Sequence, residues 1–597
     1  MVQLPTVSWP AADAAPETFA MACPNCGAEV GKPVLGRVNW QTPDHPARSM
    51  RILRCPACTC CFYDNQSPPD YADPVMLESG RQEFYLQQGA GVGLITAPLT
   101  RIARPPGSIY LEVGCGFGFG LDFALRARAW QGRGIDPAGI SELGARLLGV
   151  PVTLDYFTPG MVAAQSCDVI MGSEVIEHVK SPPAFVRDLR AALKPDGVLI
   201  LTTPDGAEIG RDVPVGVLVP LLSPGLHLVF QNAGSLERLL REAGFTEVVV
   251  ERDGLSLIAY ASAVPLRLEA DPARRRALYR GYLADRAAGL SADDELFFAF
   301  AGRALMESVN DGDFATAGRV WPSLAAALKS RHRIEPDVIA ALPAEEGSSL
   351  GALARAMPIN LGGILLARTY WRISTGIPRA AVRRQFEAAA AAARAVLLAL
   401  GALAMQDGNA EDVEWTAGAE AVLCAAAAGS EDALSGLADL PPAPGPTGAA
   451  RRREIALRAL VEMVNAGHYK LGRTLADGEK LIHLAFAAGT STGPMGTAER
   501  DALFCLAMLD WQVDDNLALA ARRFAMVCHS FPPAAPGARA HPLLWSALRG
   551  ELICRDRLGE AEPATLGARR IVDALGAGAE DMPEDLRGRL MPAVNAE

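Results

Sequence analysis

A glycine-rich stretch contains the residue types that point most directly to chemistry. Residues 111–120 read Leu-Glu-Val-Gly-Cys-Gly-Phe-Gly-Phe-Gly, between an apolar run that predicts a strand and a run, 121–129, that predicts a helix. Glycine at positions 114, 116 and 118 lets the backbone turn with positive φ and approach a ligand closely. The stretch therefore predicts a loop that holds part of a cofactor.

An acidic residue extends this pattern. Asp136 follows Gly114 by 22 residues and closes the next predicted strand. At the carboxyl end of a parallel strand, its carboxylate can accept hydrogen bonds from two ribose hydroxyls. The loop and the acid together predict a nucleoside-containing cofactor, and this much suits a nicotinamide cofactor as well.

Six of the twelve cysteines fall between Cys23 and Cys61. Two Cys-x-x-Cys knuckles, Cys23/Cys26 and Cys55/Cys58, stand 28 residues apart and offer four thiolates, which suits a tetrahedral zinc ion. Four thiolates leave no open coordination position, so we expect a structural rather than a catalytic zinc. Cys60 or Cys61 could replace Cys58 as a ligand.

Strand and helix signals alternate in the middle of the chain. Continuous apolar runs are typical of buried parallel strands, and helical segments between them imply helices on both faces of the sheet. A hairpin signal, Asp253-Gly254, predicts an antiparallel pair near the end. The predicted strands are Ser108–Val113, Gly132–Asp136, Val150–Leu154, Asp168–Gly172, Val198–Thr202, Thr246–Arg252 and Leu255–Ala261.

Residues 270–597 are rich in Ala, Leu and Arg and read as paired helices. Such pairs suggest a tetratricopeptide-like solenoid, but no fixed period is present, and an irregular helical bundle is the alternative. The proline-rich segment Leu440–Thr447 predicts a break. The expected pairs are 296–309 with 315–328, 360–373 with 381–400, 502–512 with 517–528, and 542–555 with 564–575.

The bulk composition restricts the function classes. A formal net charge of -12 disfavours a general nucleic-acid binder, because an acidic surface repels phosphates. The start of the chain lacks a secretory signal pattern, and its most apolar stretches are too short or too interrupted by proline to span a membrane. With clustered cysteines, these features predict a reduced, cytoplasmic protein.

Several motifs together resemble the class I methyltransferases that use S-adenosylmethionine (SAM). They are the glycine loop with Glu112 before it, the stretch Asp168–Val179 with its Glu177-His178 pair, and Leu193–Pro204. The segment His227–Phe245 is similar to the corresponding part of ubiquinone-pathway O-methyltransferases. The resemblance covers about residues 108–262 and implies SAM as the methyl donor.

The resemblance also implies a role for particular positions. His178 is the candidate catalytic base, because a histidine pKa near 6.5 suits proton removal at neutral pH; a packing role at a helix start is the alternative. His227 is a second candidate, expected to line the pocket. In SAM binding, the implied residues are Glu112 before the loop, Gly114, Gly116 and Gly118 around methionine, Asp136 at the ribose, Asp155 and Tyr156 near adenine, and Ser173 and Glu174 under the transferred methyl group.

We therefore expect a multidomain protein with a seven-stranded, Rossmann-like α/β methyltransferase core, a small N-terminal zinc ribbon and an all-α C-terminal region. The expected domains are 18–65, 75–265, 270–440 and 450–590. The cysteine module resembles zinc ribbons of bacterial methyltransferases that act on sugars or other small metabolites.

That resemblance favours a small-molecule, sugar or glycan acceptor as the substrate. The alternatives are a helical scaffold that binds a protein partner and methylates it, and a SAM-binding protein without transferase activity.

Overall fold

The structure is a computed structural model, and it describes residues 5–11, 17–42, 45–72, 82–339, 342, 348–402, 405–445, 447–481, 495–531, 541–575 and 582–590. These residues fall into two compact units. One comprises Met1–Pro336, Pro343–Ala367 and Ala395–Asp407. The other comprises Asp337–Leu342, Arg368–Arg394 and Gly408–Glu597.

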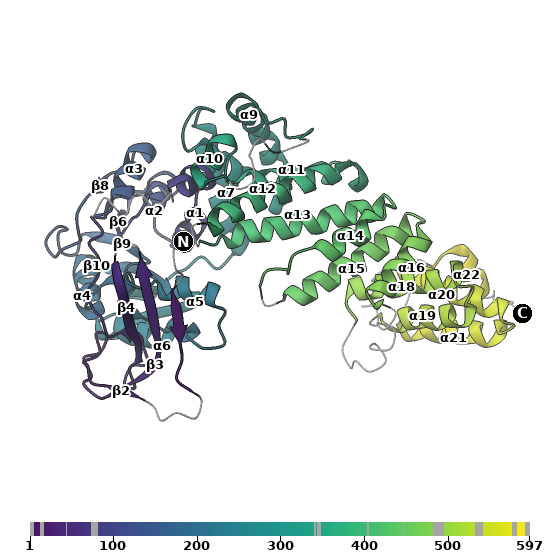
Figure 1. Ribbon diagram of the computed structural model, residues 1–597, viewed down its shortest axis with the longest axis horizontal. Helices are drawn as coiled ribbons and strands as arrows, with labels where there is room; N and C mark the ends of the chain where they lie inside the picture. The colour runs from purple at the N-terminus through teal and green to yellow at the C-terminus, as the bar shows by residue number, and fades with distance from the viewer. Residues whose placement is uncertain are drawn as a thin grey trace, which may run out of the picture. The chain divides into compact units, whose positions relative to one another are not determined.

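A seven-stranded sheet forms the centre of the first unit, as predicted (Figure 1). Its strand order is β12-β13-β10-β9-β6-β7-β8. The five strands from β10 to β8 are parallel, and the hairpin β12–β13 adds the antiparallel pair expected at Asp253-Gly254. The strands are β6 (Ile109–Val113), β7 (Gln131–Ile135), β8 (Val152–Thr153), β9 (Cys167–Ser173), β10 (Leu193–Pro204), β12 (Glu247–Asp253) and β13 (Ser256–Ser262).

The helices that connect these strands begin where the sequence supplies caps. Ser181 accepts a hydrogen bond from the Ala184 N–H at the start of α4, and Asn232 and Ser235 form a reciprocal capping box at the start of α6. Helices α4 and α6 pack together over a core that includes Val186 and Leu239. The helices are α1 (Val92–Thr100), α2 (Phe119–Arg126), α3 (Gly139–Leu148), α4 (Pro182–Ala192), α5 (Val215–Leu222) and α6 (Ala233–Glu242), with a π-helix, η2 (Phe84–Gln88), before α1.

The cysteine module is a second sheet, larger than the sequence predicts. The segment between the two knuckles forms a long β-hairpin, β3–β4, drawn in purple in Figure 1. The last strand of this sheet, β11, comes from the middle of the chain and pairs with β5. The strands are β1 (Thr6–Ser8), β2 (Thr18–Phe19), β3 (Lys32–Thr42), β4 (His45–Arg54), β5 (Cys61–Tyr63) and β11 (Val229–Phe230).

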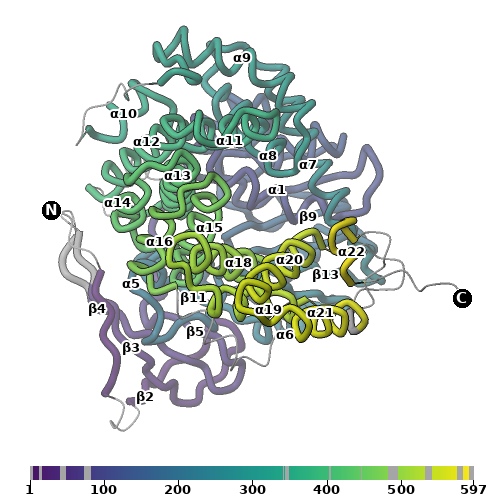
Figure 2. Tube along the Cα trace, turned by 90° about the vertical axis from the view of Figure 1, so that its right-hand side faces the viewer, coloured from purple at the N-terminus to yellow at the C-terminus, as the bar shows by residue number. Residues whose placement is uncertain are grey.

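Everything described beyond β13 that has regular structure is helical, as predicted. In the second unit, α18, α19, α20 and α21 each pack against the next, which is visible at the yellow end of the chain in Figure 2. The helices are α7 (Pro272–Ala288), α8 (Phe297–Asn310), α9 (Phe314–His332), α10 (Leu350–Ala356), α11 (Leu361–Ser374), α12 (Arg383–Gly401), α13 (Gly408–Ala427), α14 (Asp432–Asp439), α15 (Gly448–Asn465), α16 (Tyr469–Gly478), α18 (Thr497–Gln512), α19 (Leu517–His529), α20 (Pro542–Arg557), α21 (Ala561–Leu575) and α22 (Glu584–Leu590).

Among the described residues, none of the single helices combines the length and the apolar character that a membrane crossing requires. One bent pair, Leu350–Ala356 with Leu361–Ser374, passes the same criteria by length and composition alone.

Candidate functional site

The glycine loop joins the end of β6 to the start of α2. Gly114, Gly116 and Gly118 have φ values of 69°, 52° and 91°, the left-handed region that favours glycine. A Cβ on Gly114 would lie 2.3 Å from the Val175 side chain, so a larger residue cannot fit there. A Cβ on Gly116 would meet no described atom within 4 Å. The backbone at Gly116 is therefore open to a ligand.

Asp136 follows β7 and lies beside this loop. One carboxylate oxygen accepts a hydrogen bond from the Gly116 N–H at 2.8 Å, and the other accepts one from the Ala138 N–H at the same distance. The side chain is 7% exposed, so a small part of it faces solvent. The structure thus brings together the loop and the acid that the sequence places 22 residues apart.

Glu112 lies under the loop rather than at its surface. Its carboxyl group packs against the start of α2, where a Cβ on Gly120 would lie 2.5 Å from Oε1. Burial, together with the charge of Asp136, raises the pKa of Glu112 to about 8. The carboxyl group is therefore mainly protonated at neutral pH.

Ser173 and Glu174 follow directly in the chain at the end of β9. The Thr202 hydroxyl lies 2.8 Å from the Ser173 hydroxyl and donates to Glu174 Oε1 at 2.9 Å. Glu174 has a φ of 54°, an uncommon conformation for a residue with a side chain, which is typical of functional sites. Burial raises the pKa of Glu174.

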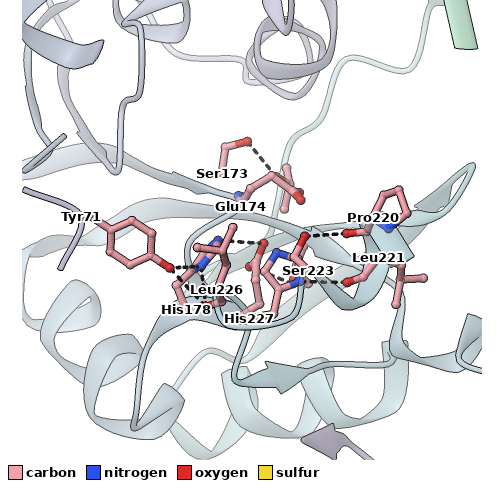
Figure 3. A network of polar contacts seen from close by, with 12 residues as sticks. Tyr71, Ser173, Glu174, His178, Pro220, Leu221, Ser223, Leu226 and His227 are labelled. Atoms are coloured by element: carbon pink, nitrogen blue, oxygen red, sulfur yellow. Dashed lines mark hydrogen bonds and ion pairs between the residues drawn. The ribbon is translucent and has the colours of Figure 1, made fainter. Parts of the chain in front are cut away.

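His178 lies just beyond, in a short 3-10 helix, Ile176–His178. Figure 3 shows its ring beside Tyr71 and Leu226. Nδ1 is 2.6 Å from the Tyr71 hydroxyl and 3.1 Å from the Leu226 carbonyl oxygen, and the Tyr71 hydroxyl also donates to that carbonyl. Because a carbonyl only accepts, this geometry assigns the proton to Nδ1 and leaves a lone pair on Nε2. Burial lowers the pKa of His178, which keeps the ring neutral at pH 7.

His227 is held in the same way. Its Nδ1 is 2.9 Å from the Leu221 carbonyl oxygen, which also assigns the proton to Nδ1. Its ring lies edge to face with that of His178, with centroids 4.8 Å apart. Burial and the neighbouring His178 lower the pKa of His227 to about 3, so its Nε2 lone pair is available across the physiological range.

Glu177 completes a cluster with these two rings. It is fully buried, and its Oε1, 3.9 Å from His178 Nε2, has no hydrogen-bond partner among the residues that the structure describes. Burial and the charge of Glu174 raise the pKa of Glu177 well above its usual range. Ligand atoms of Glu177, His178 and His227 lie within 4.8 Å of one another, so the cluster could hold a proton or a metal ion.

The two residues implied near adenine lie at the rim of the same edge of the seven-stranded sheet. Asp155 and Tyr156 follow β8, and Tyr156 is 42% exposed. The Tyr156 hydroxyl donates to an Asp70 carboxylate oxygen at 2.9 Å and accepts from the Tyr71 N–H at 2.8 Å. Tyr71 therefore links Tyr156 to His178. Tyr71 was not predictable from the sequence, because it lies outside every motif and carries no spacing signal.

The two cysteine knuckles converge as predicted. The Sγ atoms of Cys23 and Cys58 are 3.7 Å apart, as are those of Cys26 and Cys55. Four thiolates about 2.3 Å from a tetrahedral zinc lie about 3.8 Å from one another, so the observed spacing fits a zinc ribbon. The Asn25 side-chain amide points at Cys58 Sγ from 3.7 Å, where it can donate to a thiolate.

The two adjacent cysteines differ in position. Cys60 Sγ lies 3.6 Å from Cys23 and 3.3 Å from Cys58, so Cys60 stays an alternative ligand. Cys61 belongs to a separate hydrophobic cluster with Ile52 and Phe230, away from the other thiols.

The module is attached to the chain segment that carries His227. Strand β5 pairs with β11, which begins two residues after His227, and the Leu228 N–H donates to the Glu177 carbonyl oxygen at 2.7 Å. The Gln231 side chain donates to the buried Asn25 side chain at 2.8 Å. The cysteine module and the Glu177–His178–His227 cluster therefore share one short segment, 227–231.

The fold and this edge of the sheet define a class of protein: a Rossmann-like methyltransferase fold with a glycine loop after the first strand of the parallel set and an acid after the next. A family described as a methyltransferase domain matches residues 88–250. The chain belongs to the SAM-dependent methyltransferase family.

Three matches are representative of the proteins to which this chain is similar. A ubiquinone biosynthesis O-methyltransferase of Paramagnetospirillum magneticum is 31% identical over 214 residues, 33% of this chain and 80% of that protein. A "Probable S-adenosylmethionine-dependent methyltransferase" of Mycolicibacterium smegmatis is 34% identical over 145 residues, 24% of this chain and 53% of that protein. A solved SAM-dependent methyltransferase from Aquifex aeolicus is 18% identical, with a TM-score of 0.25, covering 31% of this chain and 98% of that one. The chain spans about half the length of several of its curated relatives.

Proposed function

We propose that this protein transfers a methyl group from SAM to a small-molecule acceptor. One observation carries the proposal. The open backbone at Gly116 follows β6, and Asp136, which is bonded to it, follows β7. Glu174, Glu177 and His178 follow the neighbouring strand β9. Parallel strands end at the same edge of a sheet, so a donor loop and a polar, buried cluster lie side by side.

In this proposal, each implied residue keeps the role that the resemblance gives it. Gly114, Gly116 and Gly118 contact the methionine part of SAM, Asp136 exchanges its backbone partners for ribose hydroxyls, and Asp155 and Tyr156 lie near adenine. Glu112 supports the loop from beneath, and Ser173 and Glu174 lie under the reacting methyl group.

His178 is the proposed base. Methyl transfer is an in-line displacement at carbon, and an acceptor hydroxyl or amine must lose a proton. The Nε2 lone pair of His178 faces the buried cluster, and Tyr71 and Leu226 fix the ring. If a cation occupied the cluster, the same lone pair would bind it, and the cation would lower the pKa of an acceptor hydroxyl instead.

For the acceptor we propose a small molecule with a hydroxyl group. The matched relatives include proteins named as ubiquinone biosynthesis O-methyltransferases, and the cysteine module resembles those of enzymes that act on sugars. The other candidate is a protein bound by the helices of the second unit. We also propose that Cys23, Cys26, Cys55 and Cys58 hold a structural zinc ion.

The test is a binding and turnover experiment on the full chain. Calorimetry is expected to show SAM binding in the wild type and a loss of about tenfold or more in Asp136→Ala, because two ribose hydrogen bonds disappear. Production of S-adenosylhomocysteine is then measured with a panel of catechols, phenols and nucleotide sugars. A folded wild-type chain that does not bind SAM would rule out the proposal.

A further inference from the structure

A short π-helix, η2, packs on the glycine loop. The Tyr85 ring stacks on the ring of Phe117, with centroids 5.2 Å apart and planes 2° from parallel. Phe117 stands between the two glycines that open the loop, Gly116 and Gly118. The position of η2 therefore bears directly on the shape of the proposed SAM pocket.

This segment cannot hold its conformation alone. The described helical residues here, 82–88, are fewer than an isolated helix needs to be stable in water, and π-helices are rare and frequently found at functional sites. Gly89 ends the helix with a φ of 63°. The contacts that hold η2 must therefore come from elsewhere in the chain.

They come from the helical part of the first unit. The Arg303 guanidinium of α8 donates from Nε to the Gln88 carbonyl oxygen at 2.7 Å, and the Gln88 side chain donates to Asp407 at 2.9 Å. The Gln87 side chain donates to the Ala354 carbonyl oxygen at 2.8 Å and accepts from the Ile359 N–H at 2.9 Å. Residues 215 to 319 positions away in sequence thus hold both glutamines.

Helices α7 and α8 also pack against the start of α2. Phe300 of α8 packs edge to face on Phe119, the first residue of α2, with centroids 6.1 Å apart. Asp122 of α2 is fully buried and accepts from the Tyr282 hydroxyl at 2.7 Å, with Arg286 at 3.0 Å. Helices α7 and α8 therefore both contact α2, the helix that directly follows the glycine loop.

We propose that η2 forms a wall of the SAM site and that Arg303 is a positioning residue that holds this wall on the glycine loop. The inference rests on the proposed function and extends it: residues well beyond the methyltransferase match help to bind the methyl donor. Arg303 acts through Gln88 and Tyr85 and does not itself contact SAM. Loss of its contact lets Tyr85 leave Phe117 and opens the loop to water.

The experiment compares SAM binding by calorimetry in four full-length variants. Arg303→Ala and Tyr85→Leu are expected to raise the Kd for SAM about tenfold, because each removes a contact worth roughly that factor. Tyr85→Phe keeps the stacked ring and is expected to bind SAM more tightly than Tyr85→Leu. Arg319→Ala is the matched control: this arginine of α9 bonds only within its own helix, to Thr316, among the contacts described for it.

Two further readouts separate positioning from general damage. The KM for SAM is expected to rise while kcat changes less than threefold, and Arg303→Lys is expected to recover part of the affinity because it keeps a donor. Wild-type affinity in both folded Arg303→Ala and Tyr85→Leu overturns the inference. If Arg303→Ala does not fold, Tyr85→Leu against Tyr85→Phe decides it. Absence of SAM binding in the wild type would instead remove the proposed function.

Discussion

At the scale of single residues, burial is the main cause of the pKa shifts in the site. Glu112, Glu174 and Glu177 all have raised pKa values with burial as the largest cause, while His178 and His227 have lowered ones for the same reason. Burial thus favours the neutral form of every one of these groups. A neutral site suits a reaction in which a cationic donor becomes neutral as it loses its methyl group.

His178→Ala is expected to keep SAM affinity and to slow methyl transfer by about a hundredfold or more. Because burial places the pKa of His178 below 6.5, the wild-type kcat should not change with pH around pH 7 and should fall only at a pH below 6.5. His227, with a pKa of about 3, does not titrate in this range. Steady-state kinetics from pH 5 to 8 measure both effects.

Two outcomes bear on this assignment. Unchanged turnover in His178→Ala would show that the ring only packs. A bound metal that survives mutation of the cysteine module but disappears in His227→Ala would identify the cluster as a cation site, and His178 as a ligand rather than a base.

Glu112→Gln tests the buried carboxyl group through stability. In the folded chain Glu112 keeps its proton up to about pH 8, whereas the unfolded chain loses it near 4.5. The folded state therefore binds more protons between these values, and its stability falls as pH rises, by about 1.4 kcal/mol per pH unit. Glutamine removes this contribution, so the melting temperature of the SAM-free variant should fall less between pH 5 and pH 8 than that of the wild type. Parallel curves for the two proteins would contradict the prediction.

At the scale of elements, the cysteine module and β11 form one sheet. The knuckles join the two ends of the hairpin β3–β4, and Val38, Met50 and Ile52 of this hairpin pack in one hydrophobic cluster with Phe230 of β11. Because β5 pairs with β11, a folded module also holds in place the chain segment that carries His227. The module is therefore expected to matter for the acceptor side of the site more than for SAM.

Cys23→Ser is expected to reduce the zinc content from about one equivalent to less than about half. Its KM for the acceptor should rise several-fold while the Kd for SAM stays the same, because the hydrogen bonds described for the glycine loop go to residues of the methyltransferase core and not to the module. Cys61→Ala is the matched control, and it should keep its zinc because Cys61 faces the other cluster. Full zinc in Cys23→Ser, or loss of zinc in Cys60→Ala, would assign the fourth ligand differently.

At the scale of the whole molecule, the first unit continues past the region that matches known methyltransferases. Asp122 finds its partners Tyr282 and Arg286 on α7, and Arg303 of α8 reaches η2. The second unit has its own hydrophobic cores, around Leu460 and Phe524. The first unit is therefore expected to contain all that SAM binding needs.

A chain ending at residue 265 is expected to bind SAM at least tenfold more weakly than the full chain, because it loses the contacts of α7 with Asp122 and of α8 with Phe119. A chain ending at Asp407, which includes every segment of the first unit, should bind SAM like the full chain. SAM binding by calorimetry and production of S-adenosylhomocysteine are measured for the full chain and for both shortened chains. Full activity at residue 265 would show that α7 and α8 are accessory, and a need for the second unit would favour a protein acceptor.

The sequence alone determined the local features. Gly114, Gly116 and Gly118 need positive φ, continuous apolar runs need burial as parallel strands, and two Cys-x-x-Cys pairs need to converge, so the seven-stranded core and the cysteine cluster were predictable. The all-helical C-terminal region followed from periodicity in the same way.

Only the tertiary structure decided which distant residues meet. The pairing of β11 with β5, the hydrogen bond between Tyr71 and His178, and the hydrogen bond from Arg303 to Gln88 each join positions more than a hundred residues apart. Tyr71, Gln88 and Arg303 stand in no motif of the sequence, since a single hydrogen bond places no demand on neighbouring sequence. The same holds for Glu112: its motif fixed its place in the chain, but its protonation depends on burial, which folding alone creates.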